Sequence, residues 1–426
     1  MIALVDGNNF FVSCERVFDP SLNGKPVAVL SNNDGCCISR SNEFKSLGIA
    51  MGTPYFQLQD KIEKYGLVLR SSNYELYGDL SRRIISILHN FSPDVEQYSI
   101  DEAFIRFQTS GNKNTAGNVL SYYLELGQKI RSTVLQWVGI PCGIGFAPSK
   151  TLAKIANHIG KKLPGGVFVM PEDPGEILEK LPVEEVWGVG RRLAPKLIRC
   201  RIRTAWDLAN AEESFLREKF NITLAKTARE LRGEDLFRDE ESNILSQSIT
   251  CSRSFGEVVT TLEELSQAVC SYAATGAMKL RKEQQTATGV NIYFQYYPEY
   301  SPYTLPGGCT ATTIIFPRPT CHTTEILSAI TPKLKGIFVP FRRYKKAGIT
   351  YFGLESYQNK QGDLFTDREQ EKRNENLSAA LDLINKKFGK KTLFHLSEGI
   401  KNSWQMKRNM LTKHYTTSWD ELMEVK

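Results

Sequence analysis

The chain has 426 residues, of which 41% are hydrophobic and 24% charged, and its formal net charge is +7. This length exceeds the size at which a single hydrophobic core stops growing, so we expect about two to four domains. No apolar run approaches the roughly 18 residues of a membrane span, and the first residues lack the pattern of an export signal. We therefore expect a soluble, cytoplasmic protein with no membrane partner.

The nine cysteines and five histidines are scattered along the chain. No cysteines form a C-x-x-C pair, and the histidines do not show the spacing of zinc ligands. Cysteines of cytoplasmic proteins are normally reduced thiols. The sequence therefore predicts neither a disulfide framework nor a structural zinc site.

The first part of the chain alternates predicted strands and helices. Residues 2–5 form a short apolar run that ends at Asp6 and Gly7, which indicates a buried strand followed by a turn. Residues 25–72 mix short strands with turns and predict a small inserted lobe. The other predicted elements are helices at 74–88 and 119–134 and strands at 96–107 and 142–146. This order is the split βαβ plan of a ferredoxin-like sheet.

The next part begins with a basic helix at 150–163, whose apolar stripe leaves most of its lysines on another face. Pro164 and two glycines end this helix, and the next 75 or so residues predict a small helical domain. From about Ser246 the pattern changes to the strands and helices of an α/β lobe. Polar residues dominate 356–376, which predicts a linker.

Three acidic residues lie at predicted strand ends. Asp6 ends the first strand, and Asp101 and Glu102 lie in a turn beside the strand at 96–107. Neighbouring strands of one sheet can bring such residues together, and carboxylates suit two magnesium ions about 4 Å apart that catalyse phosphoryl transfer. Taken singly, these residues fit ordinary solvated turns. The metal site is therefore a hypothesis that depends on the three residues converging.

The segment 181–198 is typical of a helix-hairpin-helix. Gly188 and Gly190 would expose backbone amides that bind a DNA phosphate without reading the base, and Arg191 and Arg192 add positive charge. The alternative is an ordinary turn between two helices. The apolar and basic residues around the glycines favour phosphate binding.

A basic stretch at 326–354 contains no acidic residue. Aromatic residues interleave with its basic residues on a predicted strand, which suits contact with a nucleic-acid backbone. A solvated basic face is the alternative. The basic residues are Lys333, Lys335, Arg342, Arg343, Lys345 and Lys346.

Two apolar side chains interrupt the polar linker, in a short segment formed by Gln361, Leu364 and Phe365 with the two residues between them. A Leu-Phe pair in a flexible segment can serve as a peptide anchor for a groove on a partner protein. Isolated apolar surface residues usually have no function. The residues alone favour neither interpretation.

Eight motifs occur together and in order along nearly the whole chain. Through them the chain resembles the Y-family DNA polymerases, and within that family it is most similar to the UmuC-type subunits, the catalytic part of bacterial polymerase V. The motifs are ALVDGNNFF at 3–11, SNNDGC at 31–36, SNYELY at 72–77, YSIDEAF at 98–104, KTLAK at 150–154, VWGVGRR at 186–192, CSRSFG at 251–256 and WQMKR at 404–408.

The resemblance implies an α+β multidomain fold with the shape of a right hand. Its parts are a ferredoxin-like palm, small fingers, a helical thumb with the helix-hairpin-helix, and an α/β little finger. The implied boundaries are 1–24 and 74–165 for the palm, 25–73 for the fingers, 166–243 for the thumb, 244–355 for the little finger, and 356–426 for a linker with the clamp-binding peptide and a C-terminal tail.

The resemblance also implies roles for residues near the three acids. Phe11 occupies the position of the family's steric gate, whose ring excludes a ribose 2′-hydroxyl. Lys161 matches a lysine that contacts the triphosphate of the incoming nucleotide. The family often has Tyr-x-x-Arg in the fingers for the same task, whereas this chain has Asn42 and Lys45. Lys45 keeps the positive charge, but lysine lacks the planar fork of arginine.

The implied activity is error-prone, template-directed DNA synthesis from dNTPs across damaged template bases, as in SOS mutagenesis. Asp6 and Asp101 would bind both magnesium ions, Glu102 would bind the ion nearer the primer, and the carbonyl of Gly7 is a further possible ligand. UmuC-type subunits carry a sliding-clamp-binding pentapeptide at the position of 361–365. The resemblance also implies a processed UmuD-like dimer and a RecA filament as partners.

Two other functions fit parts of the sequence. A catalytically silent DNA-binding scaffold of a repair complex would keep the hairpin, the basic lobe and the clamp peptide, but the intact Asp6, Asp101, Glu102 and Phe11 argue against it. A hairpin-containing DNA glycosylase also needs a catalytic acid, but the basic helix at 150–162 does not suit it. Only the polymerase requires a dNTP and a primer terminus.

Overall fold

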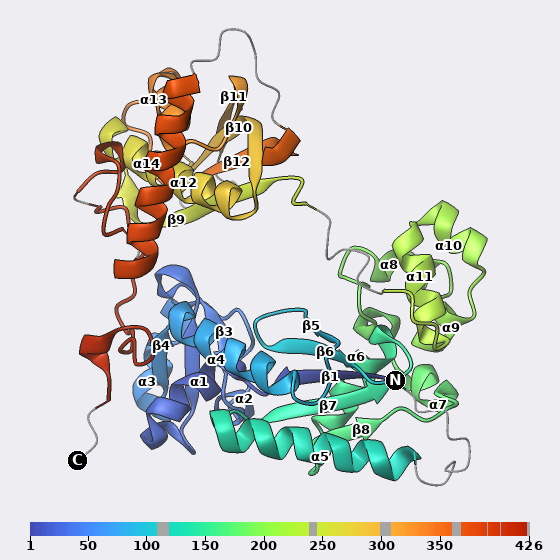
Figure 1. Ribbon diagram of the computed structural model, residues 1–426. Coiled ribbons are helices and arrows are strands. Elements are labelled where there is room, and N and C mark those ends of the chain that lie inside the picture. The colour runs from blue at the N-terminus through green and yellow to red at the C-terminus, as the bar shows by residue number, and fades with distance from the viewer. Residues whose placement is uncertain are drawn as a thin grey trace. The chain divides into compact units, whose positions relative to one another are not determined.

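The computed structural model describes residues 1–108, 119–237, 245–298, 308–359, 368–389, 391–400 and 402–423. The chain forms two compact units, whose elements are labelled in Figure 1. Unit 1 contains Met1–Asp239 and the C-terminal segment Asn409–Lys426, and unit 2 contains Glu240–Arg408. The last eighteen residues of the chain therefore belong to the same unit as its N-terminus.

The centre of unit 1 is a five-stranded sheet with strand order β5-β6-β1-β7-β8. Only β7 and β8 pair in parallel, and the other neighbours are antiparallel. This sheet confirms the strands predicted at 2–5 and 142–146, whereas the strand predicted at 96–107 is divided into two antiparallel strands. Its strands are β1 Ile2–Gly7, β5 Val95–Gln97, β6 Glu102–Arg106, β7 Cys142–Ala147 and β8 Val167–Val169.

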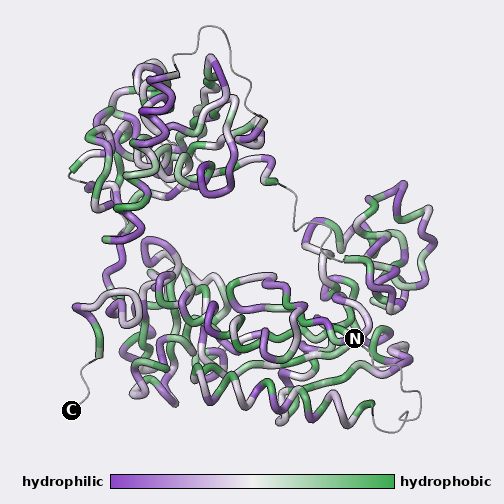
Figure 2. The backbone as a smooth tube through the Cα atoms, viewed as in Figure 1, coloured by the Kyte–Doolittle hydropathy of each residue, from purple (hydrophilic) through white to green (hydrophobic). Residues whose placement is uncertain are grey.

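Helices cover both faces of this sheet because its strands are buried on both sides. Ala3 and Val5 of β1 face a core formed with α1 Phe10–Phe18, α4 Tyr74–Leu88 and α5 Val119–Val138. Ile2 and Leu4 face the opposite core, which α6 Lys150–Gly160 completes. The hydrophobic colouring of the central strands in Figure 2 follows from this two-sided burial.

The inserted lobe predicted at 25–72 has a three-stranded sheet with order β3-β2-β4. Its small separate core confirms the lobe as a substructure of its own. The strands are β2 Val27–Leu30, β3 Cys37–Arg40 and β4 Val68–Ser71. The helical turns in and beside it are η1 Pro20–Leu22, η2 Asn32–Asp34, α2 Asn42–Ser46, η3 Tyr55–Gln57 and α3 Gln59–Tyr65.

Short helices follow the central sheet, as the glycine and proline spacing predicts. They share a core with α6 and with Ile2 and Leu4 of β1. The elements are α7 Gly175–Lys180, η5 Val183–Glu185, α8 Ala194–Arg199, α9 Ala205–Ala209, α10 Glu213–Lys219 and α11 Ile222–Leu231.

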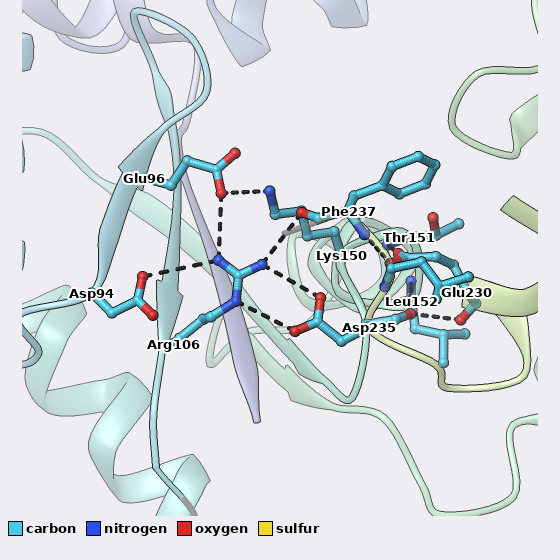
Figure 3. Close-up of polar contacts among 11 residues, drawn as sticks. Asp94, Glu96, Arg106, Lys150, Thr151, Leu152, Glu230, Asp235 and Phe237 are labelled. Carbon is cyan, nitrogen blue, oxygen red and sulfur yellow. Dashed lines mark hydrogen bonds and ion pairs between the residues drawn. The ribbon is translucent and has the colours of Figure 1, made fainter. Parts of the chain in front are cut away.

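Partly buried ion pairs join this helical part to the central sheet (Figure 3). Arg106 of β6 forms an ion pair with Glu96. It forms another with Asp235, which follows α11, and the distance from its guanidinium nitrogen to Asp235 Oδ1 is 3.4 Å. Lys150 at the start of α6 also pairs with Glu96. Because one partner of the Arg106 network belongs to the residues that follow α11, the network fixes the end of the helical part against the sheet.

Glu230, near the end of α11, makes a second connection shown in Figure 3. Its carboxylate is fully buried and accepts hydrogen bonds from the backbone N–H of Thr151, at 2.9 Å, and of Leu236, at 2.8 Å. The backbone N–H of Phe237 donates to it as well, at 3.2 Å. A buried charge is tolerated when several donors satisfy its oxygens.

Unit 2 is built on a four-stranded antiparallel sheet with order β11-β10-β12-β9. Helices α12 Leu262–Lys282 and α13 Thr323–Ile337 pack against it and share its core. The strands are β9 Ile249–Val259, β10 Gln285–Tyr296, β11 Cys309–Thr320 and β12 Tyr344–Ser356. This confirms the α/β lobe expected from about Ser246.

Two local predictions were wrong. The linker predicted at 356–376 gives way at Arg368 to α14 Arg368–Phe388, a helix whose charged composition conceals its helical period. The basic stretch at 326–354 is a strand only in its last part, because its first residues continue α13.

The remaining short turns are η7 Tyr357–Asn359, η8 Leu396–Glu398 and η9 Trp419–Glu421. Among the described helices, none has both the length and the apolar composition needed to cross a bilayer.

Candidate active site

The three acidic residues singled out in the sequence lie at one end of the central sheet. Strands β1 and β6 are antiparallel neighbours, and Asp6 lies directly opposite Glu102 in their register. The backbone N–H of Gly7 donates to the carbonyl of Asp101, at 2.9 Å. The hydroxyl of Ser99 donates to the Asp101 carboxylate at 2.6 Å and shapes the turn that holds it.

Asp6 is in a partly buried environment. Its pKa is raised to about 6, mainly by burial, and the nearby carboxylates of Glu102 and Asp101 contribute in the same direction. Lys161 acts in the opposite direction, because its Nζ lies 2.6 Å from Asp6 Oδ2. The raised pKa therefore reports chiefly the burial of the Asp6 carboxylate beside two other acidic residues, and a perturbed carboxyl of this kind marks a candidate functional site.

Glu102 is paired with a second lysine of α6. Lys154 Nζ lies 2.9 Å and 3.0 Å from the two carboxylate oxygens. The same ammonium lies 4.5 Å from the ring centroid of Tyr98 and 5.4 Å from that of Trp187. Trp187 also donates its indole N–H to the Tyr98 hydroxyl, at 3.2 Å. Cation–π contacts with the two rings therefore position the Lys154 ammonium for its ion pair with Glu102.

Glycines in β7 allow α6 to bring these lysines close to the acids. A Cβ on Gly145 would lie 2.0 Å from the backbone nitrogen of Asn157, and one on Gly143 would lie 2.7 Å from Cγ of Lys161. Only glycine permits such a close approach of helix and strand. Asn157 also donates to the carbonyl of Gly143, at 2.8 Å, which fixes the helix on the strand.

Lys161 and Lys154 form ion pairs with Asp6 and Glu102, respectively. Within the part of the chain that the structure describes, no three His, Cys, Asp or Glu side chains converge closely enough to hold a metal ion. The donor set nevertheless fits magnesium, which prefers hard carboxylate oxygens and uses few protein ligands. A metal ion at this site would compete with the two ammonium groups for the carboxylates of Asp6 and Glu102, or share the carboxylates with them.

A second group of positive charges lies where the inserted lobe meets α1. Lys45 of α2 donates to Asn9 Oδ1 at 2.5 Å, and the Asn9 amide donates to Asn42 Oδ1 at 3.0 Å. Burial lowers the pKa of Lys45, and the positive charges of Arg40 and Lys161 lower it further, while Asp6 raises it. These groups therefore share one electrostatic environment.

Phe11 lies in the first turn of α1 and is partly exposed. Its ring stacks on Tyr77 of α4 with centroids 4.6 Å apart and an interplanar angle of 15°. Tyr74 approaches Phe11 edge-on at 6.0 Å. An aromatic stack of this kind fixes the orientation of the Phe11 ring five residues after Asp6.

The hairpin at 181–198 has the features that the sequence predicts. Gly188 adopts a positive φ of 87°, and a Cβ on Gly190 would meet nothing within 4 Å. Arg191 and Arg192 are exposed. The glycine turn and both arginines therefore leave an open, positively charged surface.

The basic residues of unit 2 gather at the end of α13 and the start of β12. Lys333, Lys335 and Arg343 are exposed. Arg342 lies over the ring of Tyr296 at 4.0 Å. Arg343 and Lys345 lie over that of Tyr297, at 5.4 Å and 5.5 Å, and Lys346 follows in β12. Gln361, Leu364 and Phe365 lie outside the described residues.

Sequence reasoning missed three residues of the site. Lys154 belongs to the KTLAK motif but had no assigned partner, and Asn9 and Arg40 were not singled out. Asn42, whose departure from the family pattern left its role open, contacts Asn9 and so supports Lys45 indirectly. A lysine one helical turn from another on the face that meets the sheet is the signal that predicts Lys154.

Comparisons with known proteins identify the family. The family model described as "impB/mucB/samB family" matches residues 5–158, its C-terminal domain matches 246–364, and a domain of unknown function matches 375–425. Protein UmuC of Salmonella typhimurium is 42% identical over all of both chains, and protein MucB of Escherichia coli is 39% identical over 98% of each. The chain belongs to the UmuC-type Y-family DNA polymerases.

More distant relatives agree with this membership. DNA polymerase IV 1 of Halalkalibacterium halodurans is 30% identical over 68% of this chain and 69% of its own. A chimera of the Y-family polymerases Dbh and Dpo4 has the same fold, with a TM-score of 0.61 at 20% identity over 84% of this chain and all of the chimera. An insertion ternary complex of Dbh gives a TM-score of 0.51 at 19% identity, over 84% of this chain and all of Dbh.

The family membership settles the activity. This polymerase is an error-prone, DNA-directed DNA polymerase of translesion synthesis, and its reaction is divalent-metal-dependent nucleotidyl transfer from dNTPs on a DNA partner. Its fold is the α+β polymerase fold that the resemblance implied. The scaffold alternative is not favoured.

Proposed function

We propose that Asp6, Asp101 and Glu102 are the catalytic carboxylates and that they bind two magnesium ions, with the carbonyl of Gly7 as a further ligand. The observation that carries the proposal is the placement of Asp6 opposite Glu102 at a sheet end where burial and neighbouring carboxylates raise the pKa of Asp6. When bound, the two ions supply activation of the primer 3′-hydroxyl and neutralisation of the pyrophosphate.

The lysines around these acids bind the triphosphate of the dNTP in this proposal. Lys161 and Lys45 supply point charges for its phosphate oxygens. Lys161 now pairs with Asp6, and its ammonium would be free to contact phosphate oxygens if a metal ion held the Asp6 carboxylate instead. The support is that the three groups lie close enough to interact: Lys161 lowers the pKa of Lys45, and Asp6 raises it.

Phe11 acts as the steric gate in this proposal. Its ring is partly exposed and stacks on Tyr77. The stacking restricts rotation of the ring, so that a ribose 2′-hydroxyl would clash with it. The hairpin glycines with Arg191 and Arg192 bind duplex phosphates, and the basic residues of unit 2 bind the DNA backbone.

The domain assignments belong to the same proposal. The central sheet is the palm, the inserted lobe is the fingers, the helices from α7 to α11 are the thumb and unit 2 contains the little finger. In addition, 361–365 binds the sliding clamp, and a UmuD-like dimer and a RecA filament complete the active complex in the cytoplasm. Replacing Leu364 and Phe365 with alanine tests the clamp contact, because loss of clamp binding with unchanged DNA binding is expected.

Primer extension tests the catalytic assignment. Purified wild type and the Asp101→Ala plus Glu102→Ala variant are compared on undamaged and abasic templates with magnesium and dNTPs, with RecA filament and UmuD-like subunits added if needed. We expect extension to disappear in the variant. The matched control replaces two exposed acids of α3, Asp60 and Glu63, with alanine. Wild-type extension by the double variant would refute the assignment.

A further inference from the structure

The C-terminal segment returns to unit 1 and forms backbone hydrogen bonds with the inserted lobe. We call residues 409–415 the strap. Met410 and Ser71 are linked twice, because Met410 N–H donates to Ser71 Oγ at 2.9 Å and Ser71 N–H donates to the Met410 carbonyl at 3.0 Å. Asn409 N–H donates to Asp34 Oδ2, also at 2.9 Å.

The residues that receive the strap are buried polar groups. Asp34 is 6% exposed, and Ser71 and Asn73 are fully buried. The Asn73 amide donates to Thr412 Oγ1 and to the Lys413 carbonyl, each at 3.2 Å. Buried polar groups need hydrogen-bond partners, and the strap supplies them.

These contacts explain the polar residues of two motifs, to which the proposed function gives no role. SNNDGC at 31–36 contributes Asp34, and SNYELY at 72–77 contributes Asn73 and begins α4. An aromatic pair fixes the far end of the strap, where Tyr415 stacks on Phe18 of α1 with centroids 4.9 Å apart and an interplanar angle of 3°. The strap therefore spans from the inserted lobe to α1.

One strap residue is linked to the ring that faces the sugar in the proposed function. Thr412 Oγ1 donates to Glu15 Oε1 at 3.4 Å, and the Tyr77 hydroxyl donates to the same oxygen at 2.6 Å. Glu15 is only 1% exposed, so water does not replace these donors. Tyr77 in turn stacks on Phe11. The Glu15 carboxylate thus connects Thr412 to Phe11 through Tyr77.

We propose that Thr412 is a positioning residue for ribonucleotide exclusion. Its hydroxyl fixes the Glu15 carboxylate, the carboxylate fixes the hydroxyl of Tyr77, and the Tyr77 ring supports the Phe11 ring on which it stacks. The inference gives part of the domain of unknown function at 375–425 a role in substrate specificity. It rests on the proposed role of Phe11 as the steric gate.

Selectivity for the sugar tests this inference. The ratio of kcat/KM for a dNTP to that for the matching rNTP is measured with the full chain and the partners that support activity. In Thr412→Val we expect the ratio to fall about fivefold to tenfold, the effect of losing one ordinary hydrogen bond. Thr412→Ser keeps the hydroxyl and restores the ratio. Thr417→Val, an exposed threonine of the same tail, keeps the wild-type ratio.

The opposite side of the contact provides a second variant. Tyr77→Phe keeps the ring but removes the hydroxyl that Glu15 binds, so its ratio falls in the same direction. Because Thr412 and Tyr77 act through one carboxylate, the double variant loses less than the sum of the two single variants. A proportional loss with dNTP and rNTP in Thr412→Val, which leaves the ratio unchanged, would overturn the inference.

Hydrogen exchange decides the question without catalysis. In Thr412→Val we expect faster amide exchange in α1 and the first turn of α4, while α5 exchanges as in the wild type. Unchanged exchange in α1 would refute the inference. If the wild type incorporates nucleotides but Phe11→Ala does not lower the ratio, the gate assignment fails, and exchange still shows whether the strap holds α1.

Discussion

Lys154 contacts both carboxylate oxygens of Glu102, at 2.9 Å and 3.0 Å. A divalent ion that bound Glu102, as proposed, would compete with this ammonium for the carboxylate or share the carboxylate with it. The positive charge of Lys154 would then oppose metal binding. The rings of Tyr98 and Trp187 keep the ammonium beside Glu102.

Removing this ammonium should strengthen metal binding. In Lys154→Ala we expect the Kd for Mn²⁺, measured by calorimetry without nucleotide, to fall at least about threefold, because both the competing ion pair and a nearby positive charge are lost. Lys162→Ala, which removes an exposed lysine just beyond the same helix, is the control and should bind Mn²⁺ like the wild type. An unchanged Kd in Lys154→Ala would mean that the ion pair does not compete with metal.

Lys45 should affect nucleotide binding more than chemistry. In Lys45→Ala we expect the KM for dNTP in single-nucleotide incorporation to rise about tenfold with a smaller change in kcat, because one charge-assisted contact to phosphate is lost. Lys45→Arg should recover most of the affinity. Lys64→Ala in α3 removes an exposed lysine of the same lobe and serves as control. A fall in kcat at constant KM would assign Lys45 a role other than triphosphate binding.

Glu230 should be essential for the stability of unit 1. Glutamine in its place presents an amide to backbone N–H groups that now donate to a carboxylate. We expect Glu230→Gln to lower the unfolding free energy by about 2–4 kcal/mol, seen as a lower calorimetric transition temperature. Glu234→Gln removes a solvent-screened ion pair with Arg229 and should change stability little. Equal effects of the two substitutions would contradict the assignment.

Glu15 makes stability depend on pH. Burial raises its pKa above the ordinary value of 4.5, so the folded state keeps a proton that the unfolded state releases. Stability therefore falls as the pH rises from about 4.5 through the folded pKa, and stays lower above it. Glu15→Gln cannot ionise and still offers an oxygen to Tyr77. We expect its melting temperature, relative to wild type, to rise across that range, and parallel profiles would rule out this linkage.

The core of the site follows from local sequence patterns. Asp6 follows an apolar run and Glu102 begins another strand, so each residue's position at the end of a strand is predictable from a few neighbours. The ferredoxin-like order of elements predicts that their strands can be neighbours, whereas the register that places Asp6 opposite Glu102 comes from the structure. The glycine turn of the hairpin is predictable for the same reason, because Gly188 requires a positive φ.

Contacts between distant segments escape this reasoning. Asn73 and Thr412 are 339 residues apart, and neither has a neighbour that marks it as a partner. Helix α14 was missed for a different reason: its many charges lower its apolar signal, so composition favoured a linker. The ion pair between Lys154 and Glu102 depends on the close approach of α6 to β7. Gly143 and Gly145 of β7 permit this approach, but the sequence does not show which helix they face.

The strap also determines when the catalytic unit can be completed. A chain folds from its N-terminus as it is synthesised, so the central sheet and the inserted lobe acquire their structure before the strap is made. Asp34, Ser71 and Asn73 therefore lack some of their hydrogen bonds until the strap is in place. A polypeptide released early, or trimmed at its C-terminus, thus carries Asp6, Asp101 and Glu102 and still lacks the segment that connects the inserted lobe to α1.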